Sequence, residues 1–460
     1  MRTAALLGAN AMIFVAGLGL LPLLGVARSW RQLLARSGLA YLCGLLVAGI
    51  IGAHLALVHV SFGWIGLTAL TALSAGLGWW RLRGTEMPAW RRPAGLHVAG
   101  VVLLVALLAE YGRAFAVAPL NRYDAWAIWA LKGHALFAFG WADPVVFAGS
   151  EYRFANLDYP LLLPALEALD FHAMGAFDTR VLHLQFLLFL VAALLALSAL
   201  LHDRVPALLL WLSLLAIAIA PAVFDQLLTA YADVPLGLIF AVGVSAGGRW
   251  LLTQERWALA VATLCFAGAA LTKNEGILFA GAAFVGLFIA ARGRHRQLAV
   301  AVATVLALLL PWQLYVRLHD LESINYSLTD TFDFGHISGR LGVSRIAFET
   351  LGGEMVDPLQ WGLVMPLFVV LLAVALALGM RALPLYAIAL TVTSWLGLSW
   401  IYVISRFEYS SYLDSTKERV IAALVLSAAA LIPLLGAELW ASAGRSRGSD
   451  PPRSGGAQAP

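Results

Sequence analysis

Five segments of the chain combine ionisable and aromatic side chains at the edges of long apolar runs. In the first, NRYDAWAIW, Asp124 stands two residues before Trp126. Aspartate is favoured as a helix N-cap, so on a first interpretation this residue marks the start of a helix and the tryptophan is an interface anchor. A carboxylate among aromatic rings also suits a general base that takes a proton from a hydroxyl group. On the second interpretation, Asp124 is catalytic and Trp126 contacts the substrate.

The second segment, NLDYPLLLP, places Asp158 and Tyr159 directly before Pro160. Proline is well tolerated in the first turn of a helix, so we expect a helix to begin at this proline. The two residues before it either end a loop or contact a substrate, and the segment alone does not decide between these roles.

The third segment, LLTAYADVPLG, places Asp233 at the start of another apolar run, with Pro235 in its first turn. Here too an N-cap explains the aspartate. The functional alternative is a second catalytic acid that faces Asp124 and positions a sugar. Two such carboxylates would also suit a divalent cation, which is the only cofactor that the pattern suggests.

Two further segments supply cations. LTKNEGILFA contains Lys273 and Glu275 between two apolar runs, and SYLDSTKERV contains Lys417 and Arg419 before the last run. Long cationic side chains at a membrane edge pair with neighbouring acids or bind a lipid phosphate. Because ionisable groups at membrane depth usually mark a site, we predict phosphate binding by the three cations and a substrate contact by Glu275.

A polar segment, 317–358, is the remaining source of candidates. It contains several acidic residues and His336, which we expect to line a sugar pocket. The spacing of its histidine and acidic residues singles out no set of metal ligands.

The elements that must position these residues are membrane-spanning helices. The chain has 460 residues, of which 61% are hydrophobic and 12% charged, and its mean hydropathy is +0.85. Apolar runs long enough to cross a bilayer recur throughout, which predicts an all-α, polytopic transmembrane helical bundle with about thirteen spans. We expect these spans at 4–27, 38–60, 61–80, 95–117, 180–201, 206–223, 234–252, 257–273, 276–291, 297–316, 359–380, 384–404 and 419–440.

The orientation follows from arginine-rich loops, which lie on the cytoplasmic side. The basic groups concerned are Arg28, Arg31 and Arg36, then Arg81, Arg83, Arg91 and Arg92, then Arg292, Arg294 and Arg296. The long polar connections 118–179, 317–358 and 405–418 then all face the periplasm of a bacterial inner membrane. The tail at 442–460 is cytoplasmic and, being rich in Gly, Ser and Pro, is predicted to be disordered. Any chemistry is therefore periplasmic.

One short apolar segment, 159–175, is not predicted to span. Glu167, Asp170 and His172 interrupt it, and charges at mid-membrane are costly. We expect an amphipathic helix that lies at, or dips into, the periplasmic interface. The net charge of +4 comes from topology-setting arginines, so no nucleic-acid partner is expected. Both cysteines lie in apolar runs, which suggests neither a disulfide nor a metal site.

The order of these motifs resembles the GT-C superfamily of integral-membrane glycosyltransferases, in particular bacterial lipid A aminoarabinose transferases and protein O-mannosyltransferase-like enzymes. An early acid in the first periplasmic loop, a proline-led helix, a Gly…Arg turn, an Asp-x-Pro-Leu turn and a Lys-x-x-Gly turn follow one another in the order of those enzymes. In this chain they are Asp124, DYPLLLP, Gly175 to Arg180, Asp233 to Leu236 and Lys273 to Gly276. The resemblance covers roughly 95–290.

The resemblance implies a domain order and a reaction. It makes 95–291 a GT-C-like catalytic core, preceded by a three-span extension at 1–94 and followed by C-terminal spans at 292–441. Such enzymes move a sugar from a polyprenyl-phosphate carrier to a lipid or glycan acceptor and invert the anomeric centre. Asp124 would be the base and Asp233 the second acid, while Lys273 and Arg419 would hold the donor phosphate.

The chain departs from the family pattern in two motifs, and other functions stay open. A single aspartate stands where some relatives have a carboxylate pair, and Tyr-Pro-Leu replaces their Pro-Pro-Leu. A lipid-linked sugar flippase or transporter would place polar residues at mid-span, whereas here they collect at one interface. An envelope glycan polymerase or ligase would use the same donor chemistry, and the sequence does not separate it from the first hypothesis.

Overall fold

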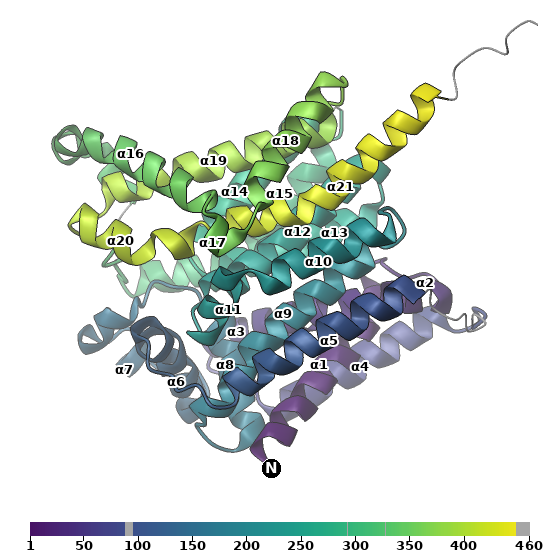
Figure 1. Cartoon of the computed structure of the whole chain (residues 1–460). Helices are drawn as coiled ribbons and strands as arrows, with labels where there is room; N and C mark the ends of the chain where they lie inside the picture. The colour runs from purple at the N-terminus through teal and green to yellow at the C-terminus, as the bar shows by residue number, and fades with distance from the viewer. Residues whose placement is uncertain (88–94, 292, 327, 448–460) are drawn as a thin grey trace, which may run out of the picture.

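The chain is helical throughout the part described by the computed structural model, which comprises residues 1–87, 95–291, 293–326 and 328–447 (Figure 1). The described residues form no strand, and their one isolated β-bridge joins Tyr326 to Ser405. Helices α1 to α21 comprise long apolar rods, several of which follow one another directly in the chain, and other helices that connect the rest. The predicted all-α class is therefore confirmed.

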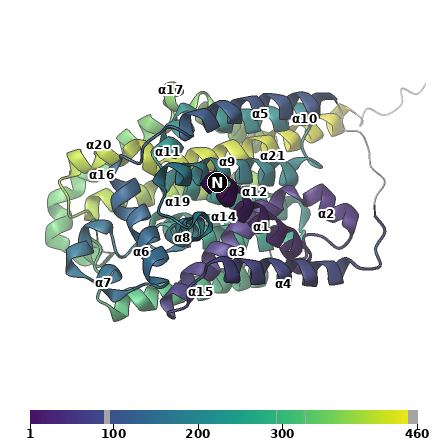
Figure 2. The same cartoon turned by 90° about the horizontal axis from the view of Figure 1, so that it is seen from below.

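The rods run roughly alongside one another and form the body of the molecule (Figures 1 and 2). They are α1 (Arg2–Leu23), α3 (Gly38–Leu57), α4 (Trp64–Leu82), α5 (Gly95–Phe115), α9 (Thr179–Leu201), α10 (Ala207–Ile219), α12 (Asp233–Thr253), α13 (Arg256–Thr272), α14 (Glu275–Ala290), α15 (His295–Leu318), α18 (Val364–Ala377), α19 (Ala382–Ile404) and α21 (Ala422–Arg447). Each of the thirteen predicted spans coincides with one of these rods.

Eight of the described helices are long and apolar enough to cross a membrane, or nine if α10 and α11 (Pro221–Leu228), which meet at 47°, form one bent span. The chain is thus a multi-pass helical membrane bundle. Helices α13, α14 and α18 are apolar but shorter than 18 residues, and α4 is not among the eight. The count of thirteen spans stays a prediction.

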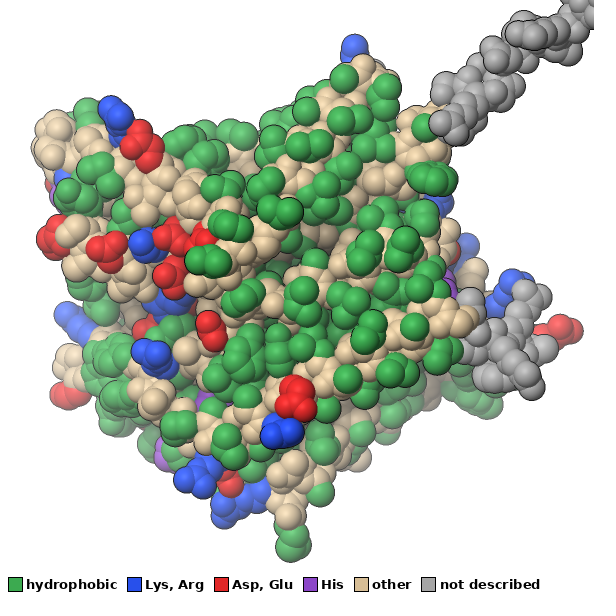
Figure 3. Space-filling view, in the orientation of Figure 1, with side chains coloured by type: hydrophobic (Ala, Val, Ile, Leu, Met, Phe, Trp, Pro, Cys, Tyr) green, Lys and Arg blue, Asp and Glu red, His purple; other side chains and the backbone are tan. Residues whose placement is uncertain are grey.

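The remaining helices, which are short except for one of 22 residues, gather mainly at one end of the bundle, at the left of Figures 1 and 2. They are η1 (Asp124–Ala130, a π-helix), α6 (Leu131–Phe139), α7 (Pro144–Phe147), η2 (Ser150–Ala155), α8 (Leu162–Met174), η3 (Leu328–Phe332), α16 (Phe334–Met355), α17 (Pro358–Trp361) and α20 (Tyr409–Val420), whereas α2 (Trp30–Arg36) lies at the opposite end. Charged side chains are concentrated over the first end, and the visible face of the rods is largely apolar (Figure 3).

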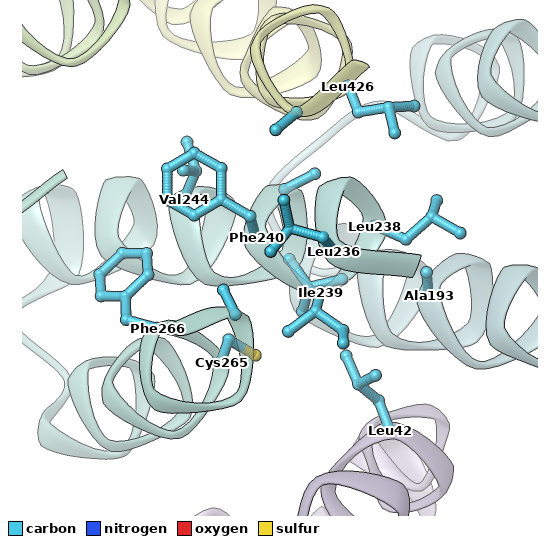
Figure 4. Packing of buried hydrophobic residues seen from close by; sticks show 14 of the residues in the cluster. Leu42, Ala193, Leu236, Leu238, Ile239, Phe240, Val244, Cys265, Phe266 and Leu426 are labelled. Atoms are coloured by element: carbon cyan, nitrogen blue, oxygen red, sulfur yellow. The ribbon is translucent and has the colours of Figure 1, made fainter. Parts of the chain in front are cut away.

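Helix α12 forms the centre of the bundle, packed between α9, α13 and α21 (Figure 4). Its Phe240 and Ile239 are fully buried, with Phe266 of α13 nearby. Because lipid tails are as apolar as these side chains, helix association in a bilayer depends on close packing. Gly237 permits it here, since a Cβ at this position would press on the Ala423 backbone of α21.

The N-terminal rods belong to the same packed unit as the rest. Helices α1, α3 and α4 cross at small residues: Gly17 lies against the Ala40 carbonyl group, and Gly19 against Ser74. Helix α3 then packs on α8 and α9, and one hydrophobic cluster runs from α1 to α21. At the other end of the chain, helix α21 continues to Arg447, so the tail predicted from residue 442 begins as helix, and its residues 448–460 lie outside the described part.

The segment predicted as an interfacial helix is α8, which begins at Leu162 instead of at Pro160. It has 13 residues, too few to span. Its side chains are nearly all buried among α1, α3, α6 and α9, so it is inserted into the bundle and does not lie on its surface. Protein neighbours, including Asn10 beside Asp170, therefore surround its acidic residues.

Candidate functional site

Five charged side chains from four separate parts of the sequence meet at the end of the bundle where the short helices gather. We call Asp124, Asp233, Lys273, Glu275 and Arg419 the charged cluster. Arg419 Nη1 lies 2.5 Å from Asp124 Oδ2 and 4.0 Å from Asp233 Oδ2. Lys273 Nζ lies 2.8 Å from Asp233 Oδ1 and 3.3 Å from Glu275 Oε1. The pairs form one continuous chain of alternating charge.

Neither catalytic candidate caps its helix. The N-cap positions before Asp124 and Asp233 belong to Tyr123 and Ala232, neither of which makes a side-chain capping bond. Asp124 instead opens η1, a π-helix, which is a geometry often found at functional sites. Its carboxylate points to Arg419, so the N-cap interpretation is wrong for both aspartates.

Asp233 holds the two cations together. Its side chain is buried and its two oxygens contact different cations, Lys273 and Arg419. A carboxylate with both oxygens engaged has little capacity left to accept a substrate proton. Asp124 is held through one oxygen only, and 26% of its side chain is exposed. The geometry therefore separates a positioning acid, Asp233, from an accessible one.

Lys273 lies in the break between α13 and α14, where the backbone is extended (φ −156°, ψ 155°). The helices can turn back sharply here because Gly276 lies directly against the Ala269 carbonyl group. Burial lowers the pKa of Lys273, but the carboxylates of Asp233 and Glu275 outweigh it and raise the pKa above its ordinary value. The lysine is therefore a permanent cation within the protein.

Arg419 lies near the end of α20, with its guanidinium 4.4 Å from the centre of the Tyr231 ring. Its Nε is buried and has no hydrogen-bond partner among the described residues. A guanidinium has five N–H donors in a planar fork, which suits a phosphate as well as a carboxylate. The side chain therefore has donors left for a further anion.

A cavity of about 680 Å³ lies beside the charged cluster, between α14, α15 and α19. Asp158 marks its polar side: Asn274, the neighbour of Lys273, donates to Asp158 Oδ2 at 2.7 Å. Asp158 Oδ1 is buried and has no hydrogen-bond partner in the described structure. Burial raises the pKa of this carboxyl group, and the charge of Lys132 opposes the shift. The rest of the lining is mixed and comprises Ile277, Leu278, Gln313, Val316, Leu321, Glu322, Ser323, Tyr326, Thr329, Gly397, Trp400, Ile401, Ile404 and Arg406.

Lys132 is a residue of this region to which the sequence assigned no role. It is fully buried and donates to the carbonyl groups of Asn156 (2.5 Å) and Tyr159 (3.5 Å), which flank Asp158. Burial lowers the pKa of Lys132 to about 7, although Asp158 counteracts this. The one signal in the sequence is scarcity, because the chain has only three lysines.

Tyr159 connects the two parts of the site. Its ring lies 5.8 Å from Lys273 Nζ and stacks on Trp129 at 5.6 Å. Its hydroxyl group accepts a hydrogen bond from Asn325 at 3.0 Å. The Tyr159 ring is therefore in contact range of both Lys132 and Lys273, and its stacking and hydrogen bond hold the loop that carries Asp158.

Three predicted site residues have their recorded contacts elsewhere. Lys417 pairs with Glu354 at 3.0 Å and with Asp414 at 3.8 Å. His336 lies in α16, where its Nε2 is 3.3 Å from Arg340. Trp126 is half exposed and packs edge-on against Tyr123. The structure does not bring these three into the charged cluster.

The charged cluster does not fit the divalent cation that the sequence suggested. Arg419 contacts both Asp124 and Asp233, and Lys273 contacts Asp233, so positive side chains stand where a metal would bind. No group of three or more His, Cys, Asp or Glu suited to a metal occurs in the described residues. Both cysteines are buried and free, as expected.

A comparison of the chain with protein-family models, with curated proteins and with solved structures found no match.

Proposed function

We propose that the protein is an inverting glycosyltransferase that moves a sugar from a polyprenyl-phosphate carrier to a lipid or glycan acceptor of the cell envelope. One observation carries the proposal: a buried lysine, a half-buried arginine and a more accessible carboxylate meet at the polar end of an apolar bundle. Lys273 and Arg419 would bind the donor phosphate, and Asp124 would serve the attacking hydroxyl group. The motif order that resembles the GT-C superfamily supports the same assignment.

The proposed reaction needs one base and a stabilised leaving group. The acceptor oxygen attacks the anomeric carbon from the face opposite the phosphate, and its proton passes to Asp124. The bond between the anomeric carbon and the phosphate oxygen breaks, and its electron pair leaves with the polyprenyl phosphate. Fixed cations at that oxygen stabilise the charge that develops there, so no acid is required. Asp233 keeps both cations in place.

The cavity beside the cluster has the shape and chemistry of an amphipathic donor. Ile277 and Leu278, about one helical turn beyond Lys273, give it an apolar wall for an isoprenoid chain. Asp158 and Asn274 give it hydrogen-bonding groups for sugar hydroxyls. A lipid-linked sugar could therefore place its phosphate at Lys273 with its chain towards the bilayer.

We place the protein in a bacterial inner membrane with thirteen spans and with the charged cluster at the periplasmic face. The distribution of arginines supports this orientation, because α2, which carries Arg31 and Arg36, lies at the end of the bundle opposite the short helices (Figure 1). Polyprenyl-phosphate sugars presented in the outer leaflet would then reach the cavity from the side.

Transfer can be measured in proteoliposomes that contain the full chain, native lipid extract as acceptor and radiolabelled polyprenyl-phosphate sugars. We expect one of the sugars to be transferred with release of polyprenyl phosphate, and we expect Lys273→Gln to abolish the release. Movement of the intact lipid-linked sugar between leaflets, without cleavage, would instead identify a flippase and refute the proposal.

A further inference from the structure

The charged cluster already neutralises its own cations. It holds three carboxyl groups and two cations, so both cations already have acidic partners before any ligand enters. A phosphate added to this arrangement would meet repulsion from the acids as well as attraction from the cations. Binding of an anion therefore requires that one carboxylate gives up its cation.

The contacts single out Asp124 as the carboxylate that leaves. Asp233 contacts both cations and is buried, and Glu275 is buried beside Lys273. Among the described residues Asp124 is held by Arg419 alone, through one oxygen, and its side chain is about four times as exposed as that of Asp233 (26% against 6%). Moving a partly exposed carboxylate into water costs less than moving a buried one.

Arg419, the other partner of this ion pair, is positioned to exchange the Asp124 carboxylate for a phosphate. Arg419 has a buried Nε without a hydrogen-bond partner in the described structure, and its guanidinium is already positioned by Tyr231 and Asp233. A phosphate can take the Nη1 donor now used by Asp124, and a hydrogen bond from a guanidinium to a phosphate is strong because both groups are charged.

From these contacts we infer that the donor phosphate and Asp124 compete for Arg419, so that donor binding releases the carboxylate that serves the acceptor. The inference rests on the proposed function. In the absence of donor, Asp124 is directed towards Arg419. With the donor bound, Arg419 holds the phosphate and Asp124 is free to turn to the acceptor. The donor must then bind first, because an acceptor that binds alone finds the Asp124 carboxylate still paired with Arg419.

If Asp124 and the phosphate compete for Arg419, removing the Asp124 charge should increase the affinity of the protein for a polyprenyl phosphate. The probe is farnesyl phosphate, a short polyprenyl phosphate, bound to the purified full chain in detergent and measured by isothermal titration calorimetry. Asp124→Asn should bind it about tenfold more tightly than the wild type, because the competing anion is gone. Glu349→Gln, the same change at an exposed acid of α16 paired with Arg345, should leave the affinity unchanged.

A double-variant cycle separates competition from a general effect of charge. In an Arg419→Gln background, Asp124→Asn should bring no gain. An equal gain in that background, no gain in the single variant, or no binding of the probe to the wild type would each overturn the inference. If Arg419→Gln does not fold, the shorter Arg419→Lys takes its place, and the gain should again shrink.

The result is independent of turnover. If the cycle behaves as expected while the wild type transfers no sugar, the competition stands and the proposed function fails. If sugar is transferred but Asp124→Asn gains no affinity, the function stands and the competition fails.

Discussion

Asp233 shows at the scale of single residues why position decides role. Two aspartates occupy equivalent places at helix starts, yet one is buried between two cations and the other is partly exposed, with one cationic partner among the described residues. The order of motifs over 95–290 predicted that Asp124, Asp233 and Lys273 belong together, and Arg419 was added because it is a cation just before the last span. Their division of labour was not predictable, because it depends on contacts between residues 40 to 295 positions apart.

Contacts between distant residues also explain why the sequence analysis missed some site residues and misplaced others. Asn274 donates a hydrogen bond to Asp158, and the charge of Lys132 lowers the pKa of the same carboxyl group. Neither interaction is predictable from a local sequence pattern. Lys417 looked equivalent to Arg419 two residues later, but the two side chains lie on different sides of α20 and only the arginine reaches the cluster.

The two cations should therefore differ sharply in effect. Lys273→Gln leaves Asp233 and Glu275 buried without their shared partner, so we expect a loss of stability on the order of 3 kcal/mol and at least a ~100-fold loss of sugar transfer. Lys417→Gln breaks a partly exposed pair and should change the stability by less than about 1 kcal/mol. Thermal unfolding in detergent and the transfer assay measure both. Equal losses in the two variants would contradict the assignment of the phosphate site.

Lys132 should make stability depend on pH. Its pKa in the folded state is about 7, below the value near 10.4 of an exposed lysine, so the unfolded chain binds more protons between these limits. The contribution of Lys132 to the free energy of unfolding should accordingly rise as the pH increases from 7 to 10, and it should be lowest below pH 7. Lys132→Met should flatten this part of the profile in thermal unfolding scans. An unchanged slope in the variant would show that other groups cause it.

At the scale of elements, the break between α13 and α14 is the feature that places Lys273. The apolar runs on both sides were recognisable from the sequence, and so was the short turn between them. The close approach of the two helices at Gly276 was not, because it depends on how α13 packs. Similarly, α8 was recognised as too short and too charged to span, but its burial inside the bundle follows from neighbours supplied by α1, α3 and α6.

Gly276→Ala should disturb this turn. A Cβ here would collide with the backbone of Ala269, so the helices must separate and Lys273 must move from Asp233. We expect a lower unfolding temperature and weaker binding of farnesyl phosphate. Gly281→Ala, in the same helix but facing open space, is the matched control and should be neutral or slightly stabilising. Wild-type behaviour of Gly276→Ala would show that the turn tolerates expansion.

At the scale of the whole molecule, hydropathy predicted where every rod lies, because apolar length is a local property. Eight of the helices meet the length and hydropathy expected of a span, and the shorter ones depend on their neighbours for burial. The place of the cavity between α14, α15 and α19 was not predictable, because it is a space left by the packing of separate rods, although part of its lining does come from the polar segment 317–358.

The orientation of the bundle can be tested with introduced cysteines, because both native cysteines are buried. Ser150→Cys, in the first polar connection, should react with a membrane-impermeant maleimide in intact cells. Glu86→Cys, exposed at the opposite end, should react only after the inner membrane is permeabilised. The reverse pattern would put the charged cluster in the cytoplasm and remove the basis for a periplasmic reaction.

The central claim is that Asp124 takes the proton of the acceptor, and one comparison tests it most directly. Transfer from the polyprenyl-phosphate sugar is measured at saturating donor for Asp124→Asn and for Asp143→Asn, a change in the same connection at an aspartate that only caps α7. We predict that kcat falls by ~100-fold or more in the first variant, with the donor still bound, and stays near the wild-type value in the second. A near-normal kcat in Asp124→Asn would contradict the account.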